Sequence, residues 1–344
     1  MRMTEPATRG RRLIGGTTGV MLAALMLPGA AAAQSSGGGG PLSLFDTIFT
    51  SSIARQSPFQ HANAPAAPVN APTNDAPMPS GNAKPWSGED GASGHPLMTA
   101  AAIRQAAANF PNCVAGMWPD AARRGVSRAS FERYTAGLIP DLRLMDLMDS
   151  QPEFTKAIWD YLDILVSDTR IARGREILAQ YKPQFDAMER AYGVDRYIVA
   201  SIWGIESNYG TQGGDRSVVN STATLACVGR RQAYFKDEFL AALEILHRGD
   251  VRPDHLKGSW AGAFGGTQFM PTSFKRFAVD FDGDGRRDVV DNPTDLIAST
   301  ANNLKKDGWQ SGQTWGYEVV VPRGFDYMLA DRAKVMTLAQ WQHL

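Results

Sequence analysis

Apolar residues recur at every third or fourth position over most of the chain from Leu97 onward, which is the spacing of amphipathic helices. Helix-start and helix-stop residues lie at the ends of these periodic segments. The expected N-caps are Ser127, Asp195 and Asn292, the expected stops are Gly193, Gly210, Gly249 and Gly308, and Pro183 indicates a kink or a junction. An alternating apolar run appears only late, in "GYEVVVP". The pattern predicts a mainly α fold (α+β) with minor β structure.

The first 97 residues lack this periodicity and divide into two parts. Residues 1–33 carry arginines, then an apolar stretch, then three alanines, which is the pattern of a secretory signal peptide. Residues 34–97 are rich in Gly, Pro, Ala, Ser and Asn and have too little apolar surface to offset the entropy of ordering, so we expect a disordered linker. The folded domain is expected over residues 98–344. A retained membrane anchor is the alternative for the N-terminus, but the A-x-A end favours cleavage and no retained transmembrane helix.

Charge and cysteine content narrow the possible functions. The chain has 35 basic and 35 acidic residues, so electrostatics gives no case for binding nucleic acid. An exported chain meets an oxidising compartment, where Cys113 and Cys227 are expected to form a disulfide. Neither cysteine lies in a metal-ligand spacing such as C-x-x-C, which favours the disulfide; two unpaired buried thiols are the alternative.

The segment "DFDGDGRRDVVD" has the spacing of a calcium-binding loop. Its acidic residues occupy positions 1, 3, 5, 9 and 12 and are Asp280, Asp282, Asp284, Asp288 and Asp291. Gly285 at position 6 permits the sharp turn, and Arg286 at position 7 would offer its backbone carbonyl. Position 12 is Asp and not the usual Glu, which shortens its reach. We expect structural Ca²⁺; a solvated acidic turn is the alternative.

A carboxylate lies on the apolar side of a predicted helix in "YIVASIWGIESNYG". Ile198, Ile202 and Ile205 form the apolar stripe of this segment, and Glu206 follows Ile202 by four residues. Carboxylates are rarely placed on a buried face unless they are paired or used chemically. A glutamate at the edge of the core, satisfied by an arginine or by backbone amides, is the alternative to a catalytic acid.

The segment "GSWAGAFGGTQFMPTSF" combines glycines, aromatic residues and uncharged polar residues without a regular period. Glycine lets another part of the chain approach its backbone closely, and Ser259 and Gln268 can supply orienting hydrogen bonds. Trp260, together with Tyr209 from the Glu206 segment, offers aromatic faces of the kind that line sugar-binding grooves. Such residues are also common in cores, so a purely structural role is the alternative.

These three segments, in this order and near this spacing, resemble the membrane-bound lytic murein transglycosylase B family, glycoside hydrolase family 103, from about Phe110 to the end of the chain. The resemblance implies a lysozyme-like catalytic domain in the periplasm. It implies cleavage of the β-1,4 bond between N-acetylmuramic acid and N-acetylglucosamine, with a 1,6-anhydromuramyl product. It makes Glu206 the acid/base, and it places Ser259 and Gln268 near that carboxylate and the substrate. Peptidoglycan strands are the expected partner, and proteins of cell-wall synthesis or division are candidate partners.

The expected mechanism needs one carboxylate and no catalytic cofactor. A carboxylic acid in an apolar setting keeps its proton more readily and can donate it to the departing glycosidic oxygen. The acetamido group of the substrate can then stabilise the positive centre, while the deprotonated glutamate activates the tethered 6-hydroxyl of the same sugar. Asp215 is the nearest acidic residue after Glu206, and it lies in a glycine-rich loop.

Two departures from the family accompany this expectation. Family members continue beyond the equivalent of Leu344 through a segment that carries a Tyr-Asn pair into the glycan cleft, so the chain is expected to lack the usual C-terminal part. An aromatic residue is expected near Cys227 and is absent from "ACVGRR". A hydrolytic muramidase that uses the same glutamate with water, and a non-catalytic peptidoglycan-binding protein, are the alternative functions.

Overall fold

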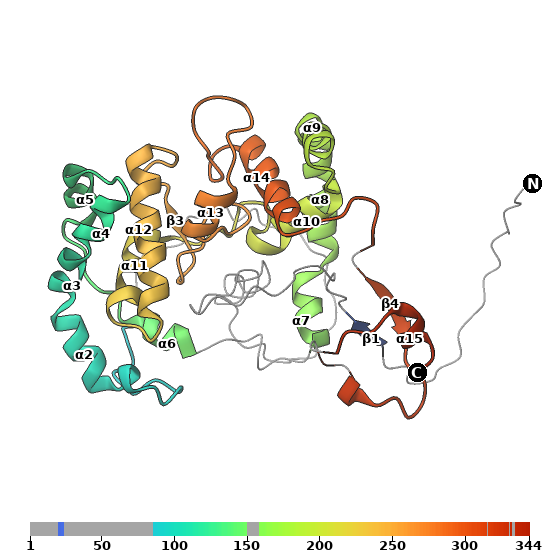
Figure 1. Cartoon of the computed structure of the whole chain (residues 1–344), viewed down its shortest axis with the longest axis horizontal. Helices are drawn as coiled ribbons and strands as arrows, with labels where there is room; N and C mark the ends of the chain where they lie inside the picture. Colours follow the sequence, from blue (N-terminus) through green and yellow to red (C-terminus); the bar gives the residue numbers. More distant parts are fainter. Residues whose placement is uncertain (1–19, 24–84, 150–157, 315, 330, 332–333) are drawn as a thin grey trace, which may run out of the picture. The chain divides into compact units, whose positions relative to one another are not determined.

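The structure is a computed structural model that describes residues 20–23, 85–149, 158–314, 316–329, 331 and 334–344. Helices make up nearly all of its regular structure, in agreement with the mainly α pattern of the sequence (Figure 1). The chain divides into two units, of which one is Ser36–Ser311 and the other is formed by Met1–Ser35 and Gly312–Leu344.

The unit Ser36–Ser311 is built from helices joined by short connections. In chain order these helices are η1 (Pro96–Met98), α2 (Ala100–Ala108), α3 (Phe110–Gly116), α4 (Trp118–Arg123), α5 (Arg128–Thr135), α6 (Arg143–Asp149), α7 (Ile158–Leu165), α8 (Asp168–Gln180), α9 (Lys182–Tyr192), α10 (Arg196–Ser207), α11 (Val218–Cys227), α12 (Gln232–Arg248), α13 (Pro271–Phe277) and α14 (Pro293–Lys306). Two short strands, β2 (Arg216–Ser217) and β3 (Lys257–Gly258), pair antiparallel.

The second unit contains the strand that the late alternating run predicts. This strand, β4 (Tyr317–Val320), pairs antiparallel with β1 (Val20–Ala23). The helices η3 (Tyr327–Leu329) and α15 (Leu338–Gln342) follow it. β1 lies within the predicted signal peptide, and the rest of residues 1–33 lie outside the described residues. Among the described residues, no helix has both the length and the apolar character needed to cross a membrane.

Most helix ends lie where the capping residues predict them. The side chains of Ser127, Asp195 and Asn292 each accept a hydrogen bond from a backbone N–H in the first turn of α5, α10 and α14. The junction between α8 and α9 falls at Tyr181, with Pro183 in the first turn of α9, where its missing N–H costs no helical hydrogen bond.

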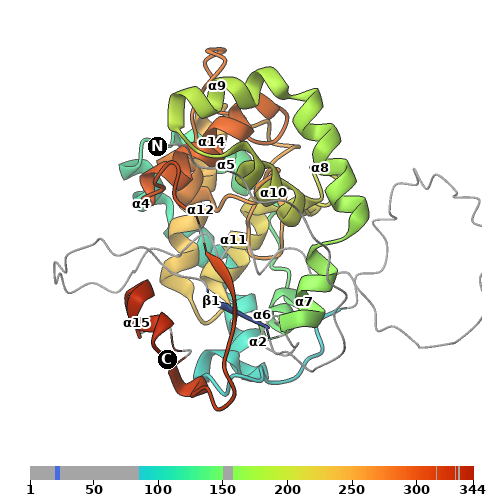
Figure 2. The ribbon, with the colours of Figure 1, turned by 90° about the vertical axis from the view of Figure 1, so that its right-hand side faces the viewer.

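Helices α11 and α12 pack together at the centre of the core (Figures 1 and 2). Every residue of α11 except Asn220 is buried, including three hydroxyl side chains. Two of these hydroxyls have hydrogen-bond partners that offset their burial: Thr222 Oγ1 donates to the carbonyl of Val218 at 2.7 Å, and Thr224 Oγ1 accepts from the amide of Asp141 at 3.1 Å. α12 packs against α4, α5 and α13, whereas α10 packs against α8, α9 and α14.

A disulfide joins Cys113 in α3 to Cys227 at the end of α11, which is the pairing expected from the even cysteine count. The two Cα atoms are 6.0 Å apart and the cysteines are separated by 114 residues in the sequence. A covalent link across so long a loop reduces the conformational entropy of the unfolded chain. The bond therefore ties the N-terminal helices to the central pair.

The linker boundary predicted at residue 97 is too late, because residues 85–97 pack on the helical body. Trp86 packs against the core, and the Arg104 guanidinium lies 5.3 Å from the centre of its ring. Ser87 donates to Asp146 through both its amide, at 3.0 Å, and its hydroxyl, at 2.7 Å. These contacts hold Trp86 and Ser87 against α2 and α6, although the composition of the segment alone predicts disorder. The remainder of the expected linker, residues 34–84, lies outside the described residues.

A buried glutamate caps helix α13 from a neighbouring helix. Glu238 of α12 is 1% exposed, and its carboxylate accepts from the amide of Thr272 at 2.9 Å and from the Thr272 hydroxyl at 2.7 Å. α13 has no side-chain cap of its own at Met270. Burial raises the pKa of Glu238, and the hydrogen bonds from Thr272 offset part of that rise.

We expect loss of the disulfide to lower the free energy of unfolding by about 2–5 kcal/mol. Chemical denaturation of the wild type with and without reductant measures this change. The Cys113→Ser/Cys227→Ser double variant should unfold at the same denaturant concentration as the reduced wild type and should not respond to reductant. An oxidised wild type no more stable than the double variant would contradict the expectation.

Glu238→Gln should become more stable relative to the wild type as the pH rises above about 4.5, the ordinary pKa of the group. In this range the unfolded wild type releases a proton that the folded wild type retains, so its stability falls with pH, whereas glutamine does not titrate. Melting temperatures of both proteins between pH 4 and pH 8 test this. A difference in melting temperature that stays constant with pH would refute the assignment.

Candidate functional site

The carboxylate singled out by the sequence lies at the end of α10 and is almost fully enclosed. Glu206 is 2% exposed, and Ile202 and Trp203 of the preceding turn are also buried. Asp195 and Asp215, the acidic residues before and after it in the sequence, are both exposed. The helical pattern therefore placed Glu206 correctly on a buried face.

The helix ends earlier than its glycine predicted. α10 stops at Ser207, three residues before Gly210, because Asn208 and Tyr209 adopt left-handed backbone conformations with φ of 49° and 58°. Such angles are unfavourable for residues with a Cβ. Gln268, with φ of 53°, is the only other non-glycine residue with positive φ in the described ranges. Backbone strain in the described chain is thus confined to the two segments that the sequence identified as the site, a distribution typical of functional sites.

Ser207, which sequence analysis did not select, connects these two segments. Its Oγ donates to the carbonyl of Gly266 at 2.6 Å and accepts from the amide of Gly210 at 2.9 Å. Its backbone carbonyl accepts from the amide of Gln212 at 2.7 Å. A serine directly after a glutamate at the end of an apolar helix is the only sequence signal for this residue, and it does not reveal a partner 59 positions away.

Glycine is required where the two segments touch. A Cβ on Gly266 would lie 2.7 Å from Trp203 Nε1 and 2.6 Å from Leu296 Cδ2, closer than side chains pack. A Cβ on Gly214 would collide with the backbone of Gly258, which is paired to β2 across the short ladder. The glycine-rich composition therefore serves close backbone packing, as the sequence analysis expected.

Gln268 is fully buried and holds two loops together. Its Nε2 donates to the carbonyls of Gly213, at 3.0 Å, and Gly265, at 2.9 Å. Its Oε1 is buried and accepts no hydrogen bond from the part of the chain that the structure describes. A buried amide oxygen without a donor is costly.

Ser259 and Trp260 lie in a tight turn at the start of the glycine-rich segment. Ser259 Oγ accepts from the amide of Ala263 at 3.1 Å, and the Ser259 amide donates to the Ala263 carbonyl at 2.7 Å. Ser259 is 7% exposed and Trp260 is 8% exposed. The turn orients both side chains, and their contact with a substrate stays a prediction.

Tyr209 is held by the fold. Its hydroxyl donates to the carbonyl of Arg170 at 3.3 Å, and its ring fits a slot where a Cβ on Gly174 or Gly204 would collide with it. The ring also packs edge-on to Trp203, with centroids 6.1 Å apart. Partial burial raises the pKa of Tyr209. These contacts support the left-handed turn at residues 208–209, and a substrate contact by Tyr209 stays a prediction.

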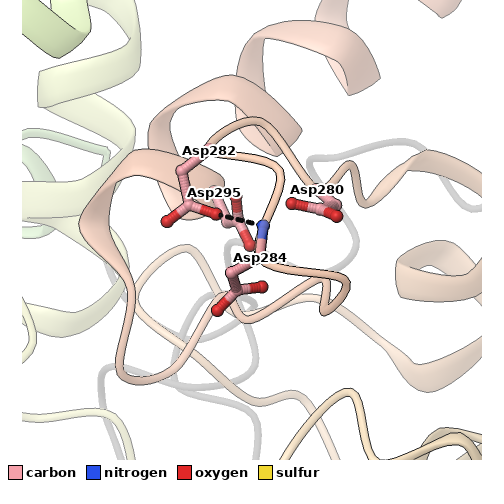
Figure 3. Close-up of side chains that lie close together, drawn as sticks. All are labelled: Asp280, Asp282, Asp284 and Asp295. Atoms are coloured by element: carbon pink, nitrogen blue, oxygen red, sulfur yellow. Dashed lines mark hydrogen bonds between the residues drawn. The ribbon is translucent and has the colours of Figure 1, made fainter.

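The calcium-type loop brings together a different carboxylate set from the one that its spacing predicts. Carboxylate oxygens of Asp280, Asp282, Asp284 and Asp295 all lie within 4.8 Å of one another (Figure 3). Asp295, in the first turn of α14, was not selected because it lies beyond the 12-residue motif. It is buried, and it accepts from the amides of Phe281, at 2.7 Å, and Asp288, at 2.9 Å.

Asp288 and Asp291 do not join this cluster. Asp288 is buried, and its carboxylate accepts from the amides of Val290 and Asp291 and from the Arg286 guanidinium. Asp291 instead pairs with the ring of His255 at 2.7 Å. Each of these carboxylates is engaged by nearer donors and neither lies in the cluster, so the ligand roles expected of both residues stay predictions. The Arg286 carbonyl as a ligand stays a prediction.

The four-carboxylate cluster fits a calcium ion. Oxygen ligands 2.3–2.6 Å from Ca²⁺ lie at most about 5 Å apart, which agrees with the spacing of these oxygens, and carboxylate oxygens are the ligands that Ca²⁺ prefers. Burial raises the pKa of Asp295, and the negative charges of Asp282 and Asp280 raise it further. A bound cation would relieve that repulsion.

The loop is fastened to the helical body on several sides. Arg287 pairs with buried Asp250, with 2.6 Å between Nη2 and Oδ2, and its guanidinium lies 5.2 Å from the centre of the Phe274 ring. The carbonyl of Val289 accepts from the amide of Gly266 at 3.2 Å. The calcium-type loop therefore contacts the same glycine that Ser207 binds.

Comparison with known proteins identifies similar chains. Residues 109–344 match the family model of the transglycosylase SLT domain (SLT_2). Membrane-bound lytic murein transglycosylase B of Escherichia coli (strain K12) is 34% identical over 179 residues, which cover 49% of this chain and 49% of that protein. The chain thus spans about half the length of this curated relative.

Several solved structures are also similar. SltB3 from Pseudomonas aeruginosa in complex with NAG-NAM-pentapeptide has a TM-score of 0.65 and 44% identity, covering 68% of this chain and 63% of that one. Escherichia coli lytic transglycosylase Slt35 in complex with calcium has a TM-score of 0.53 and 30% identity, covering 60% of this chain and 65% of that one. Their resemblance agrees with the lysozyme-like, mainly helical fold expected from the sequence.

Calcium is expected to raise the melting temperature of the wild type, and Asp295→Asn should abolish most of that rise because it removes a buried charged ligand. Asp291→Asn is the matched control, since it makes the same chemical change at the acidic residue that pairs with His255. Thermal melts of the three proteins with Ca²⁺ or with chelator test this. A calcium response lost in Asp291→Asn and kept in Asp295→Asn would restore the ligand set predicted from the sequence.

Proposed function

Because the chain belongs to the transglycosylase SLT domain family, we propose that it is a lytic transglycosylase acting on peptidoglycan. The observation that carries this proposal is the enclosed carboxyl of Glu206 at a strained helix end beside a glycine-rich segment. A proton donor for a glycosidic oxygen must be held in a fixed place and kept protonated near neutral pH. Enclosure away from water favours the protonated form of a carboxyl group.

The relatives support a substrate class. SltB3 from Pseudomonas aeruginosa was solved with NAG-NAM-pentapeptide and with NAG-anhNAM-pentapeptide. We propose that this chain cleaves the β-1,4 bond between N-acetylmuramic acid and N-acetylglucosamine in glycan strands. Ser259, Trp260 and Gln268 are the proposed substrate contacts.

A single glutamate can act first as the general acid and then as the general base of the reaction. Glu206 protonates the leaving oxygen, and the acetamido carbonyl of the muramic acid stabilises the cationic centre that forms. The glutamate then takes the proton of the 6-hydroxyl of the same sugar as that oxygen attacks the anomeric carbon, which closes a 1,6-anhydro ring. No acidic residue occurs in residues 258–274, so the glycine-rich segment supplies no second carboxylate to activate a water.

The carboxylate cluster and the disulfide support two further proposals, a structural ion and export from the cytoplasm. Asp280, Asp282, Asp284 and Asp295 would hold a structural Ca²⁺ that takes no part in the chemistry. The disulfide suits an oxidising compartment, which supports export to the periplasm. Proteins of cell-wall synthesis or division would be partners there.

We expect residues 34–344 to release muropeptides lighter than the hydrolysis products by one water, and Glu206→Gln to release none. Digests of purified peptidoglycan, read by mass spectrometry, measure both. Glu238→Gln is the matched control, because it makes the same change at a buried glutamate that caps α13, and it should keep the activity. Products that contain the extra water would identify a hydrolytic muramidase. Peptidoglycan binding without turnover by the wild-type protein, unaffected by Glu206→Gln, would instead indicate a non-catalytic peptidoglycan-binding protein.

A further inference from the structure

We propose that Ser207 is a positioning residue that fixes the Glu206 carboxyl by locking the last turn of α10 to the backbone of Gly266. The proposal rests on the proposed role of Glu206 as the proton donor. Ser207 is 1% exposed, so it acts on the reaction through its neighbour and not by touching a substrate.

The lock consists of hydrogen bonds in two directions. Ser207 Oγ donates to the carbonyl of Gly266 at 2.6 Å, across to the glycine-rich segment. The same oxygen accepts from the amide of Gly210 at 2.9 Å, across the turn that leaves the helix. One hydroxyl thus fixes the helix end both to its own exit and to the opposite segment.

The helix end needs such a lock because its exit is strained. Asn208 and Tyr209 follow directly with positive φ, and two successive non-glycine residues in this conformation persist only where the surroundings enforce it. Terminal helix turns fray readily. Since Glu206 lies in that terminal turn, fraying after loss of the lock would move its carboxyl.

Gly266, the acceptor of the Ser207 hydrogen bond, is held in place by contacts of its own. The Gly266 amide donates to the carbonyl of Val289 at 3.2 Å, in the calcium-type loop. Thr267 Oγ1 lies 2.9 Å from Thr300 Oγ1 of α14, and Leu296 of the same helix leaves no room for a side chain at Gly266. The Gly266 carbonyl is therefore a fixed point against which the helix end is held.

Displacing an acid by about 1 Å can cost on the order of 100-fold in rate while leaving substrate contacts intact. We therefore expect Ser207→Ala to lower kcat by about 10- to 100-fold with KM within about twofold of the wild type. The pH dependence of kcat should shift as well, because the surroundings of the Glu206 carboxyl change. A merely structural serine would change stability without this pattern.

The matched control is Thr224→Val, which removes another buried hydroxyl whose partner is the Asp141 amide. It should lower the melting temperature but keep kcat and its pH profile. Equal kcat losses in Thr224→Val and Ser207→Ala, or a folded Ser207→Ala variant with the wild-type kcat and pH profile, would overturn the proposal. Should Ser207→Ala not fold, Ser207→Cys keeps the side-chain shape with a weaker donor, and wild-type values in that variant would overturn it.

A second readout separates this proposal from the proposed function. Carbon-13 NMR titration of the Glu206 carboxyl and hydrogen exchange of the Gly210 amide report on the lock without turnover. In Ser207→Ala the titration midpoint should shift and the Gly210 amide should exchange faster. If the wild type cleaves no peptidoglycan, the proposed function fails, and these two measurements still decide the lock: unchanged values refute it.

Discussion

A carboxyl group enclosed at the end of a helix is the constraint on which the site depends. Removing an ionisable group from water is costly, so rigid contacts have to hold it in its buried position. Backbone contacts contribute to this: the Gly266 carbonyl accepts a hydrogen bond from Ser207, and Gly266 itself packs closely against Trp203 and Leu296. Close backbone packing is stiffer than side-chain packing because it has no rotamers to exchange.

The same constraint links parts of the chain that are far apart in sequence. Gly266 contacts α10 through Ser207 and the calcium-type loop through Val289. Asp295 opens α14 and fastens that loop through the amides of Phe281 and Asp288. The calcium-type loop, α14 and the end of α10 are therefore connected by hydrogen bonds. An ion in the loop would contribute to the order of the site without approaching the substrate.

Local signals in the sequence correctly predicted where three helices begin. Ser127, Asp195 and Asn292 cap the helices that they were expected to cap, and Pro183 lies just after the junction of α8 and α9. These predictions succeed because a cap is decided within three or four residues. The burial of Glu206 was predictable for the same reason, from its spacing to Ile202.

The features that sequence analysis missed depend on partners distant in the chain. α10 ends at Ser207 because Arg170 and Gly266 support the left-handed turn that follows, and neither is near it in sequence. Asp295 lies in the carboxylate cluster and Asp288 and Asp291 do not, because Arg286 and His255 engage those two carboxylates. Trp86 orders a polar segment because Arg104 and the core receive its ring. No local pattern contains these contacts.

The disulfide also determines how the protein would respond to proteases. Cys113 and Cys227 enclose a covalent loop that contains α10 and Glu206, whereas Gly266 and the calcium-type loop lie outside it. A single backbone cut inside the loop would leave two fragments that remain joined until the bond is reduced. A cut between residues 228 and 257 would instead separate the glutamate covalently from Gly266, leaving only non-covalent packing between the two halves of the site. Wherever proteases act and reductants are scarce, the bond would keep the fragment that carries Glu206 attached after a cut inside the loop, whereas it would not bridge a cut between residues 228 and 257.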